Sequence, residues 1–254
     1  DAIKNYSGLE LGTSGEILST KEFKLDESGV LDLGKALMAV HLSIPSGIFT
    51  GESLLEIAKV AKQVNGEIRL SVEQSLYVIT TADKAKELKE SMLFDIYSRY
   101  QNTYFNHQIA CAGTATCAFG VIPNKPDAIA LSNFLQKEVP IAGGKVRMYW
   151  SACPKGCGIH GVADIGFEGC KTKDKEGNNV DGVHIYLGGK ATKEAKEARV
   201  LYKALPIKDA RYKVKKLMEI YRDERHEIES FEAFDTRVLS LLPVDKVIEM
   251  IEKK

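Results

Sequence analysis

The hydrophobic pattern of the first third of the chain changes from strand-like to helix-like and back. Residues 38–44 are rich in aliphatic side chains and are followed by Pro45-Ser-Gly47, which predicts a strand that ends in a turn. Residues 67–72 and 76–80 have the same character, so they predict two more strands. The spacing of apolar residues between the first two of these strands predicts a helix.

Thr50 is expected to cap this helix, and Gly66 is expected to close it after Asn65. The apolar positions that recur at helical spacing are Leu54, Ile57, Ala58, Ala61 and Val64. Residues 83–90 predict a second, shorter helix. The order strand, helix, strand, strand, helix predicts a small unit that ends near residue 97.

A second α/β unit is predicted to begin near Tyr104. Residues 126–138 form a helical pattern with Ala128, Leu131 and Leu135 on one face, and residues 145–150 alternate as a half-buried strand does. The other expected elements are strands at 162–167 and 183–187, joined by a charged turn at 171–181, and helices at 192–203 and 209–222. The last segment, 224–254, predicts two packing helices interrupted at Pro243.

Composition excludes several classes of protein. With 254 residues, 44% hydrophobic and 28% charged, the chain can bury one large or two modest cores and is not disordered as a whole. The 35 basic and 35 acidic residues balance, so no global field recruits nucleic acid or an anionic membrane. No apolar run reaches the roughly 18 residues of a membrane span. The first residue is Asp1 rather than methionine, so we expect a processed or trimmed chain.

Four of the five cysteines form two close pairs, Cys111-x5-Cys117 and Cys153-x3-Cys157. A [4Fe–4S] cluster needs one thiolate per iron, and two loops can approach it from different sides. Zinc sites usually have shorter C-x2-C to C-x4-C spacings, and an odd cysteine count without a signal segment argues against disulfides. Spacing alone therefore favours an iron–sulfur cluster, with zinc and inert core thiols as alternatives. A reducing, cytoplasmic location suits such a cluster.

The residues around these pairs resemble the siroheme nitrite and sulfite reductases. The matching segments are Cys111 to Cys117, Arg147-Met-Tyr-Trp-Ser-Ala-Cys153-Pro-Lys-Gly-Cys157-Gly and Val162-Ala-Asp-Ile-Gly-Phe-Glu-Gly169. Upstream, residues 41–47 and 68–75 are similar to the ferredoxin-like half-domain of the same family. The resemblance implies an α+β (mixed α/β) fold. It consists of a ferredoxin-like half-domain at 1–97, a siroheme and cluster domain at 98–222 and a helical tail at 223–254.

The resemblance also implies cofactors and ligands. Cys111, Cys117, Cys153 and Cys157 would hold a [4Fe–4S] cluster, and Cys157 would bridge it to siroheme iron. Gly156 and Gly158 would let the macrocycle approach and leave N–H groups free for cluster sulfur, although both can be ordinary turn glycines. Cys170 has no partner at motif spacing and is expected to be a buried, dispensable thiol.

Polar residues near these segments are candidates for contacts with the substrate and siroheme. Arg147 and Lys155 are the candidate catalytic cations for an anionic substrate, and Lys145 could meet siroheme carboxylates, although each could equally be surface charge. Arg69 and Gln74 match a strand that faces the cofactor in the family; the alternative is a strand whose polar residues face water.

Three positions carry weaker expectations. Lys155 stands where the family commonly has asparagine, and so does Ser75, so the family's amide contacts do not transfer to either residue. His160 is a candidate proton relay, although an isolated histidine more often has a structural role.

The segments at 69–74, 164–167 and 188–190 look closer to the ferredoxin-dependent nitrite enzymes than to the sulfite enzymes. The resemblance therefore implies six-electron reduction of nitrite to ammonia, with sulfite as the alternative substrate and a ferredoxin-like protein as electron donor. A non-catalytic electron-transfer or cofactor-carrier subunit is the competing hypothesis. In the family the substrate-binding cations come from a preceding half-repeat, so we expect a companion half-domain or subunit. A candidate docking patch, which could equally be a solvated helix face, consists of Lys208, Arg211, Lys213, Lys215 and Lys216.

Overall fold

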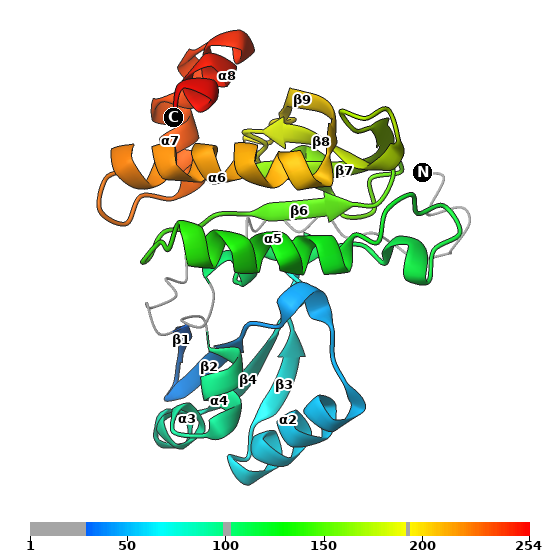
Figure 1. The fold of residues 1–254 in the computed structure, drawn as a ribbon. Helices are drawn as coiled ribbons and strands as arrows, with labels where there is room; N and C mark the ends of the chain where they lie inside the picture. The colour runs from blue at the N-terminus through cyan, green and yellow to red at the C-terminus, as the bar shows by residue number, and fades with distance from the viewer. Residues whose placement is uncertain (1–28, 99–102, 192–193) are drawn as a thin grey trace, which may run out of the picture.

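The structure is a computed structural model that describes residues 29–98, 103–191 and 194–254. It contains two large apolar cores, one formed by residues between 40 and 94 and one by residues between 104 and 251, and a small cluster of Ile109, Tyr149 and Ala163. Figure 1 shows the first unit below the second, with α5 of the second unit nearest to it. In the described ranges, no helix combines the length and apolar character that crossing a membrane requires.

The first unit is a four-stranded antiparallel sheet with helices packed against it. The strands lie in the order β1-β2-β4-β3. Their bounds are β1 Val30–Gly34, β2 Leu37–Leu42, β3 Glu67–Leu70 and β4 Leu76–Thr81, and the helices are α2 Gly51–Gln63, α3 Ala82–Lys89 and α4 Met92–Tyr97. The ferredoxin-like character and the positions of β2, β3, β4, α2 and α3 are as the sequence predicts.

Helix α2 begins as predicted, because the Thr50 side chain accepts a hydrogen bond from the Ser53 amide. Its buried face is narrower than expected, since Leu54 is 50% exposed and Ala58 is also exposed. The predicted role of Gly66 at the end of the helix is confirmed, because its amide donates to Ala61 O at 2.7 Å. The positive φ belongs to Asn65, whereas a Cβ on Gly66 would lie 2.6 Å from Val78 Cγ1.

The second unit is a mixed five-stranded sheet in the order β5-β6-β7-β8-β9. Its strands are β5 Gln108–Ala110, β6 Met148–Ser151, β7 Ile165–Lys173, β8 Asn179–Leu187 and β9 Arg199–Pro206. The pairs β5–β6 and β6–β7 are parallel, and the pairs β7–β8 and β8–β9 are antiparallel. Helices α5 Lys125–Glu138 and α6 Ile207–Glu224 run across the same side of this sheet (Figure 1).

Two predictions for this unit were wrong. Within 192–203 the described part forms strand β9 from Arg199 onward rather than a helix, because Val200 and Tyr202 pair with β8. Strand β6 is buried on both faces and not half-buried, because it lies between two parallel neighbours under the helices. The expected helix at 126–138 is confirmed, with Ala128, Leu131 and Leu135 in the core.

The C-terminal tail forms helices α7 Phe231–Arg237 and α8 Val244–Lys253, with Pro243 as the N-cap of α8. The predicted pair of helices is therefore confirmed. Phe231, Phe234, Val247 and Ile251 are fully buried in the same core as the second sheet. Short 3-10 turns occur at Pro45–Gly47, Thr103–Phe105, Gly113–Ala115, His160–Val162 and Leu239–Leu241.

Candidate metal centre

The two cysteine loops leave the sheet at the same edge. Ala110, the last residue of β5, pairs with Trp150 near the end of β6, and the strands are parallel, so both chains emerge side by side. The Cys111 amide donates to Trp150 O at 3.1 Å, and the Val121 amide donates to Ala152 O at 3.0 Å. These backbone bonds hold the loop after β5 against the loop after β6.

The sulfur of Cys111 already accepts N–H groups of the kind that stabilise a thiolate. Ala152 N lies 3.1 Å and Asn124 Nδ2 lies 3.3 Å from Cys111 Sγ. Asn124 is fully buried, and its Nδ2 is also within hydrogen-bond distance of Trp150 O. Sequence reasoning missed Asn124, because its only signal was its position just before the predicted helix.

A second contact joins the loops at their outer end. The Lys155 ammonium lies 4.5 Å from the centroid of the Phe119 ring, which is a cation–π contact between residues that flank Cys117 and Cys157. Phe119 and Cys157 are both exposed. The outer part of the paired loops therefore faces solvent, whereas Cys153 at its base is buried.

The donor set fits a four-thiolate cofactor. All five cysteines are free thiols, and the four predicted ligands lie on the two loops that the contacts above join. Among the described residues, no three His, Cys, Asp or Glu side chains form a closed metal-binding group. The structure thus provides adjacent loops and an N–H-bonded first sulfur. Cys170 lies apart from them on β7, where burial raises the pKa of its thiol.

Gly156 and Gly158 differ in their surroundings. Gly156 has φ +75°, and the atom nearest to a Cβ added at this position would be His160 Cε1 at 3.9 Å, so this glycine serves a left-handed turn with open space. A Cβ on Gly158 would lie only 1.9 Å from Trp150 O. Gly158 is therefore required because any side chain at this position would collide with the backbone of β6.

Arg147 lies just before β6, in a buried ion pair. It is 4% exposed, and its Nη2 lies 2.6 Å from Asp164 Oδ1 and 2.8 Å from Glu232 Oε2. The Arg147 amide also donates to Asp164 Oδ2 at 2.7 Å. Burial alone would lower the pKa of Arg147, but the hydrogen bonds and charges of Asp164 and Glu232 raise it. The guanidinium joins the segment before β6 to the segment before β7 and to α7.

The other predicted cofactor residues do not gather at the loops. Arg69 is exposed on edge strand β3, where it pairs with Glu67 at 2.6 Å. The side-chain amide of Gln74 forms two hydrogen bonds with the backbone of Ala110. Its Oε1 accepts from Ala110 N at 2.8 Å, and its Nε2 donates to Ala110 O at 3.1 Å. Gln74 thus fixes the strand end that leads to Cys111.

Beside Gln74, Glu73 forms a polar contact between the two units. Its carboxylate lies 2.7 Å from His107 Nδ1, 3.2 Å from Tyr149 Oη and 4.0 Å from Lys145 Nζ. Burial would raise the pKa of Glu73, but the hydrogen bond and charge of His107, with Lys145 and Tyr149, lower it to about 2. Lys145 therefore has a carboxylate neighbour within this chain.

His160 is the centre of a largely buried hydrogen-bond chain. Its Nδ1 lies 2.9 Å from Ser151 Oγ and its Nε2 lies 3.1 Å from Glu168 Oε2, which also accepts from Tyr186 Oη at 2.6 Å. Ser151 Oγ in turn accepts the Gly158 amide at 3.0 Å. Because one end of the chain is the Gly158 backbone N–H, His160 helps to fix the loop after Cys157.

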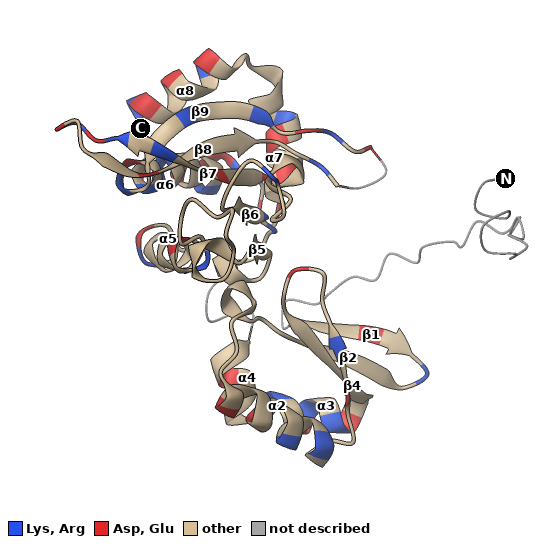
Figure 2. Ribbon diagram, turned by 90° about the vertical axis from the view of Figure 1, so that its right-hand side faces the viewer, with Lys and Arg blue, Asp and Glu red and all other residues tan. Residues whose placement is uncertain are grey.

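The predicted docking patch is partly neutralised by neighbouring acids. Lys213 pairs with Glu252, and Lys215 pairs with Glu138 at 3.0 Å. Figure 2 shows basic and acidic residues interspersed over α6 and α8. Lys208 and Arg211 lie at the start of α6, apart from these pairs.

Comparison with known proteins decides the family. The nitrite and sulphite reductase 4Fe-4S domain matches residues 106–232, and the nitrite/sulfite reductase ferredoxin-like half domain matches residues 34–94. The chain belongs to the nitrite and sulphite reductase family. This membership indicates a [4Fe–4S] cluster and siroheme as cofactors and confirms the resemblance found in the sequence.

Curated relatives in this family are ferredoxin–nitrite reductases. The chloroplastic enzyme of Spinacia oleracea is 33% identical over 179 residues, which are 69% of this chain and 30% of that protein. The enzyme of Synechococcus elongatus is 36% identical over 158 residues, which are 61% of this chain and 30% of that protein. The chain thus spans about a third of the length of these relatives.

Two solved structures share the fold. The Mycobacterium tuberculosis NirA protein superposes with a TM-score of 0.75 at 21% identity, covering 89% of this chain and 42% of that one. Dissimilatory sulfite reductase I superposes with a TM-score of 0.67 at 14% identity, covering 99% of this chain and 79% of that one. At these identities the comparison establishes the fold alone, a half-domain followed by the cluster domain.

Proposed function

We propose that this chain is the cluster-binding part of a siroheme nitrite reductase that reduces nitrite to ammonia with six electrons. The observation that carries the proposal is the pair of cysteine loops held side by side at one sheet edge, with Cys111 Sγ already accepting two N–H groups. Ferredoxin–nitrite reductases are the named relatives, which favours nitrite over the alternative, sulfite.

In this proposal Cys111, Cys117, Cys153 and Cys157 would ligate the cluster, and Cys157 would link it to siroheme. When bound, the two cofactors supply the electron storage and transfer that no side chain provides. This chain's residues position them, because Asn124 and the Ala152 amide hold Cys111 Sγ. Gly156 turns the loop before Cys157 in open space.

Lys155 is the cation best placed to meet an anion. It lies between Cys153 and Cys157, is exposed, and contacts the aromatic ring of Phe119. Arg147, by contrast, serves the fold through Asp164, and Gln74 serves the position of β5. Lys145 can reach siroheme carboxylates only in competition with Glu73.

A ferredoxin-like protein is the proposed electron donor, because the relatives are named for it. A companion half-domain or subunit is proposed because β3 is a sheet edge with an unusually apolar, exposed side. Leu70 is 84% exposed and Val72, just beyond the strand, is 91% exposed. Exposed apolar sheet edges favour pairing with another strand, so we assign this edge to the companion. We assign the assembly to the cytoplasm, because its chemistry needs a reducing compartment.

The test is anaerobic purification of residues 1–254 from cells that make siroheme. Iron, acid-labile sulfide and siroheme are measured together with turnover of nitrite and of sulfite by a reduced dye. We expect about four iron and four sulfide per chain, which Cys157→Ser lowers and Cys170→Ser leaves unchanged. Stoichiometric zinc without sulfide would refute the cluster assignment.

Turnover separates the remaining alternatives. We expect weak siroheme retention by this chain alone, because the companion's cations are missing from around the siroheme carboxylates. Bound cofactors without turnover in the assembly that contains the companion would support a carrier subunit instead. A higher kcat/KM for sulfite than for nitrite in that assembly would make this chain part of a sulfite reductase.

A further inference from the structure

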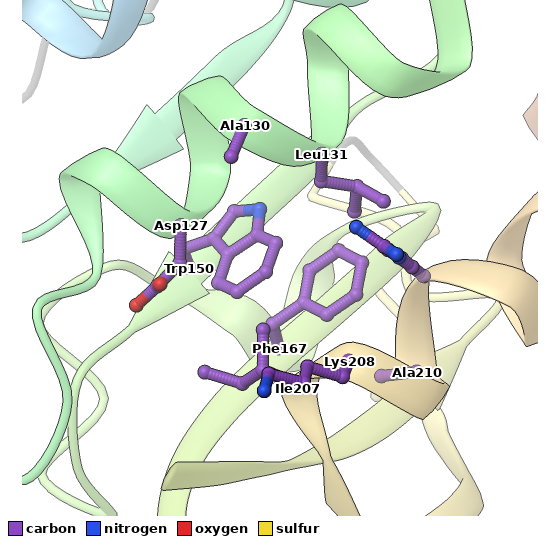
Figure 3. A pocket seen from close by; sticks show the side chains of 9 residues that line it. Asp127, Ala130, Leu131, Trp150, Phe167, Ile207, Lys208 and Ala210 are labelled. Atoms are coloured by element: carbon purple, nitrogen blue, oxygen red, sulfur yellow. The ribbon is translucent and has the colours of Figure 1, made fainter.

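A cavity of about 110 Å³ lies between α5 and α6. Its floor is formed by Trp150 and Phe167, whose rings stack with centroids 3.9 Å apart. Figure 3 shows the two rings between Ala130 and Leu131 on one side and the start of α6 on the other. Most of the lining is apolar.

One hydrogen-bond donor in this cavity lacks a partner. Trp150 is 2% exposed, and within the described residues its Nε1 has no acceptor. Figure 3 shows the indole nitrogen on the side of the ring that faces Ala130 and Leu131, which also line the cavity. Leaving a buried N–H unpaired costs about 1–3 kcal/mol, so an acceptor in the cavity would be stabilised.

Positive charge gathers at the rim. Lys208 and Arg211 line the cavity from the first turns of α6, and that helix has Pro206 at its N-cap, with no side chain capping its first amides. Helix N-termini favour anions. The single carboxylate in the lining, Asp127, already accepts the Asn124 amide at 2.9 Å as part of the cap of α5.

We propose that this cavity binds a small apolar carboxylate. The apolar body lies against Trp150 and Phe167, an oxygen accepts the indole N–H, and Lys208, Arg211 and the first amides of α6 compensate the charge. The volume is somewhat below the ~150 Å³ cavity that holds benzene, so the body is at most about one small ring. The site is independent of the proposed nitrite reduction.

Trp150 makes the site directly observable, since it is the only tryptophan in the sequence. Benzoate is titrated into the anaerobically purified chain and followed by tryptophan emission and by calorimetry. Benzyl alcohol tests the need for charge, and acetate tests the need for an apolar body. We expect saturable binding of benzoate, about tenfold weaker binding of benzyl alcohol, and no response to acetate at the same concentration.

Two exposed positions give variants that leave the core intact. Ala130→Leu places a larger side chain at the mouth of the cavity on an exposed helix position, and Lys137→Leu is its matched control on the same helix. Ala130→Leu should abolish benzoate binding, whereas Lys137→Leu should not change it. Lys208→Gln should weaken benzoate about threefold to tenfold and leave benzyl alcohol unchanged.

Several results would overturn the proposal. The first is the absence of both heat and an emission change at millimolar benzoate. The second is equal binding of benzoate and benzyl alcohol, which would mean a general apolar gap without anion recognition. The third is benzoate binding that survives Ala130→Leu, which would place the ligand elsewhere on the chain.

Discussion

Arg147 gives the clearest separation between a structural and a substrate-binding role. Its guanidinium lies 2.6 Å from Asp164 and 2.8 Å from Glu232 and is 4% exposed, so Arg147→Met would leave the 1% exposed Asp164 carboxylate without its partner. Removing one member of a buried pair costs about 3–5 kcal/mol. For a chain of this size that corresponds to a fall of roughly 6–20 °C in the thermal midpoint.

The assay is the thermal midpoint of the anaerobic protein, read from the emission of the nearby Trp150. Arg222→Met is the matched control, because Arg222 makes a 2.8 Å pair with Asp223 on the surface, where its side chain is 39% exposed. Such a pair contributes at most about 1 kcal/mol. The double variant Arg147→Met/Asp164→Leu should recover much of the loss, because it removes both buried charges.

One result would refute this reasoning. If Arg147→Met melted within about 2 °C of Arg222→Met while kcat/KM for nitrite fell at least tenfold, Arg147 would bind the anion rather than support the fold. The catalytic assignment that the sequence suggested would then stand.

Three further predictions concern the contacts around the loops. Gly158→Ala should lower the free energy of unfolding in urea by about 4 kcal/mol or more, because its Cβ would meet Trp150 O at 1.9 Å. Gly156→Ala should lower it by only about 1–2 kcal/mol, and equal losses would contradict this prediction. The neighbours of Glu73 lower its pKa from 4.5 to about 2 in the folded chain. Its contribution of about 3 kcal/mol to stability should therefore be present above pH 4.5 and be lost as the pH falls toward 2. The stability of Glu73→Gln should lack this loss at acid pH. His160→Asn should speed amide exchange at Gly158 about tenfold, and unchanged exchange would show that the Ser151 bond does not depend on His160.

The sequence predicted most elements whose signals are local. Thr50 caps the start of α2 with its side chain, and Pro243 directly precedes α8, so both helix boundaries follow from a local residue. Strand β1 was missed, because its hairpin turn uses Lys35 and Ala36 at φ 54° and 59° instead of the glycine or asparagine that normally marks such turns. Strand β9 was mistaken for a helix, because its pairing with β8 comes from tertiary context.

In the candidate site, too, features with local signals could be predicted from the sequence, and those set by tertiary contacts could not. The cysteine spacing and the family's motif predict the ligand set, because a [4Fe–4S] cluster needs four thiolates and two loops can supply them. Asn124 and the partners of Arg147 could not be predicted, because their contacts join positions 13 to 85 residues apart along the chain. Polar residues in a motif region have more than one use, and only the fold decides which groups are already paired.

Gln74 shows how the first unit acts on the candidate metal centre through the strand that leads to it. Its amide carries both an acceptor and a donor, so it can pair with the N–H and C=O of Ala110 as a neighbouring strand would. The strand fixed in this way is only three residues long and leads directly into Cys111. Ser46 Oγ, 2.6 Å from Gln108 Oε1, and Glu73 beside His107 hold the same segment from the same unit. A three-residue strand has little stability of its own, so the position of the first cysteine depends on these contacts from the ferredoxin-like unit.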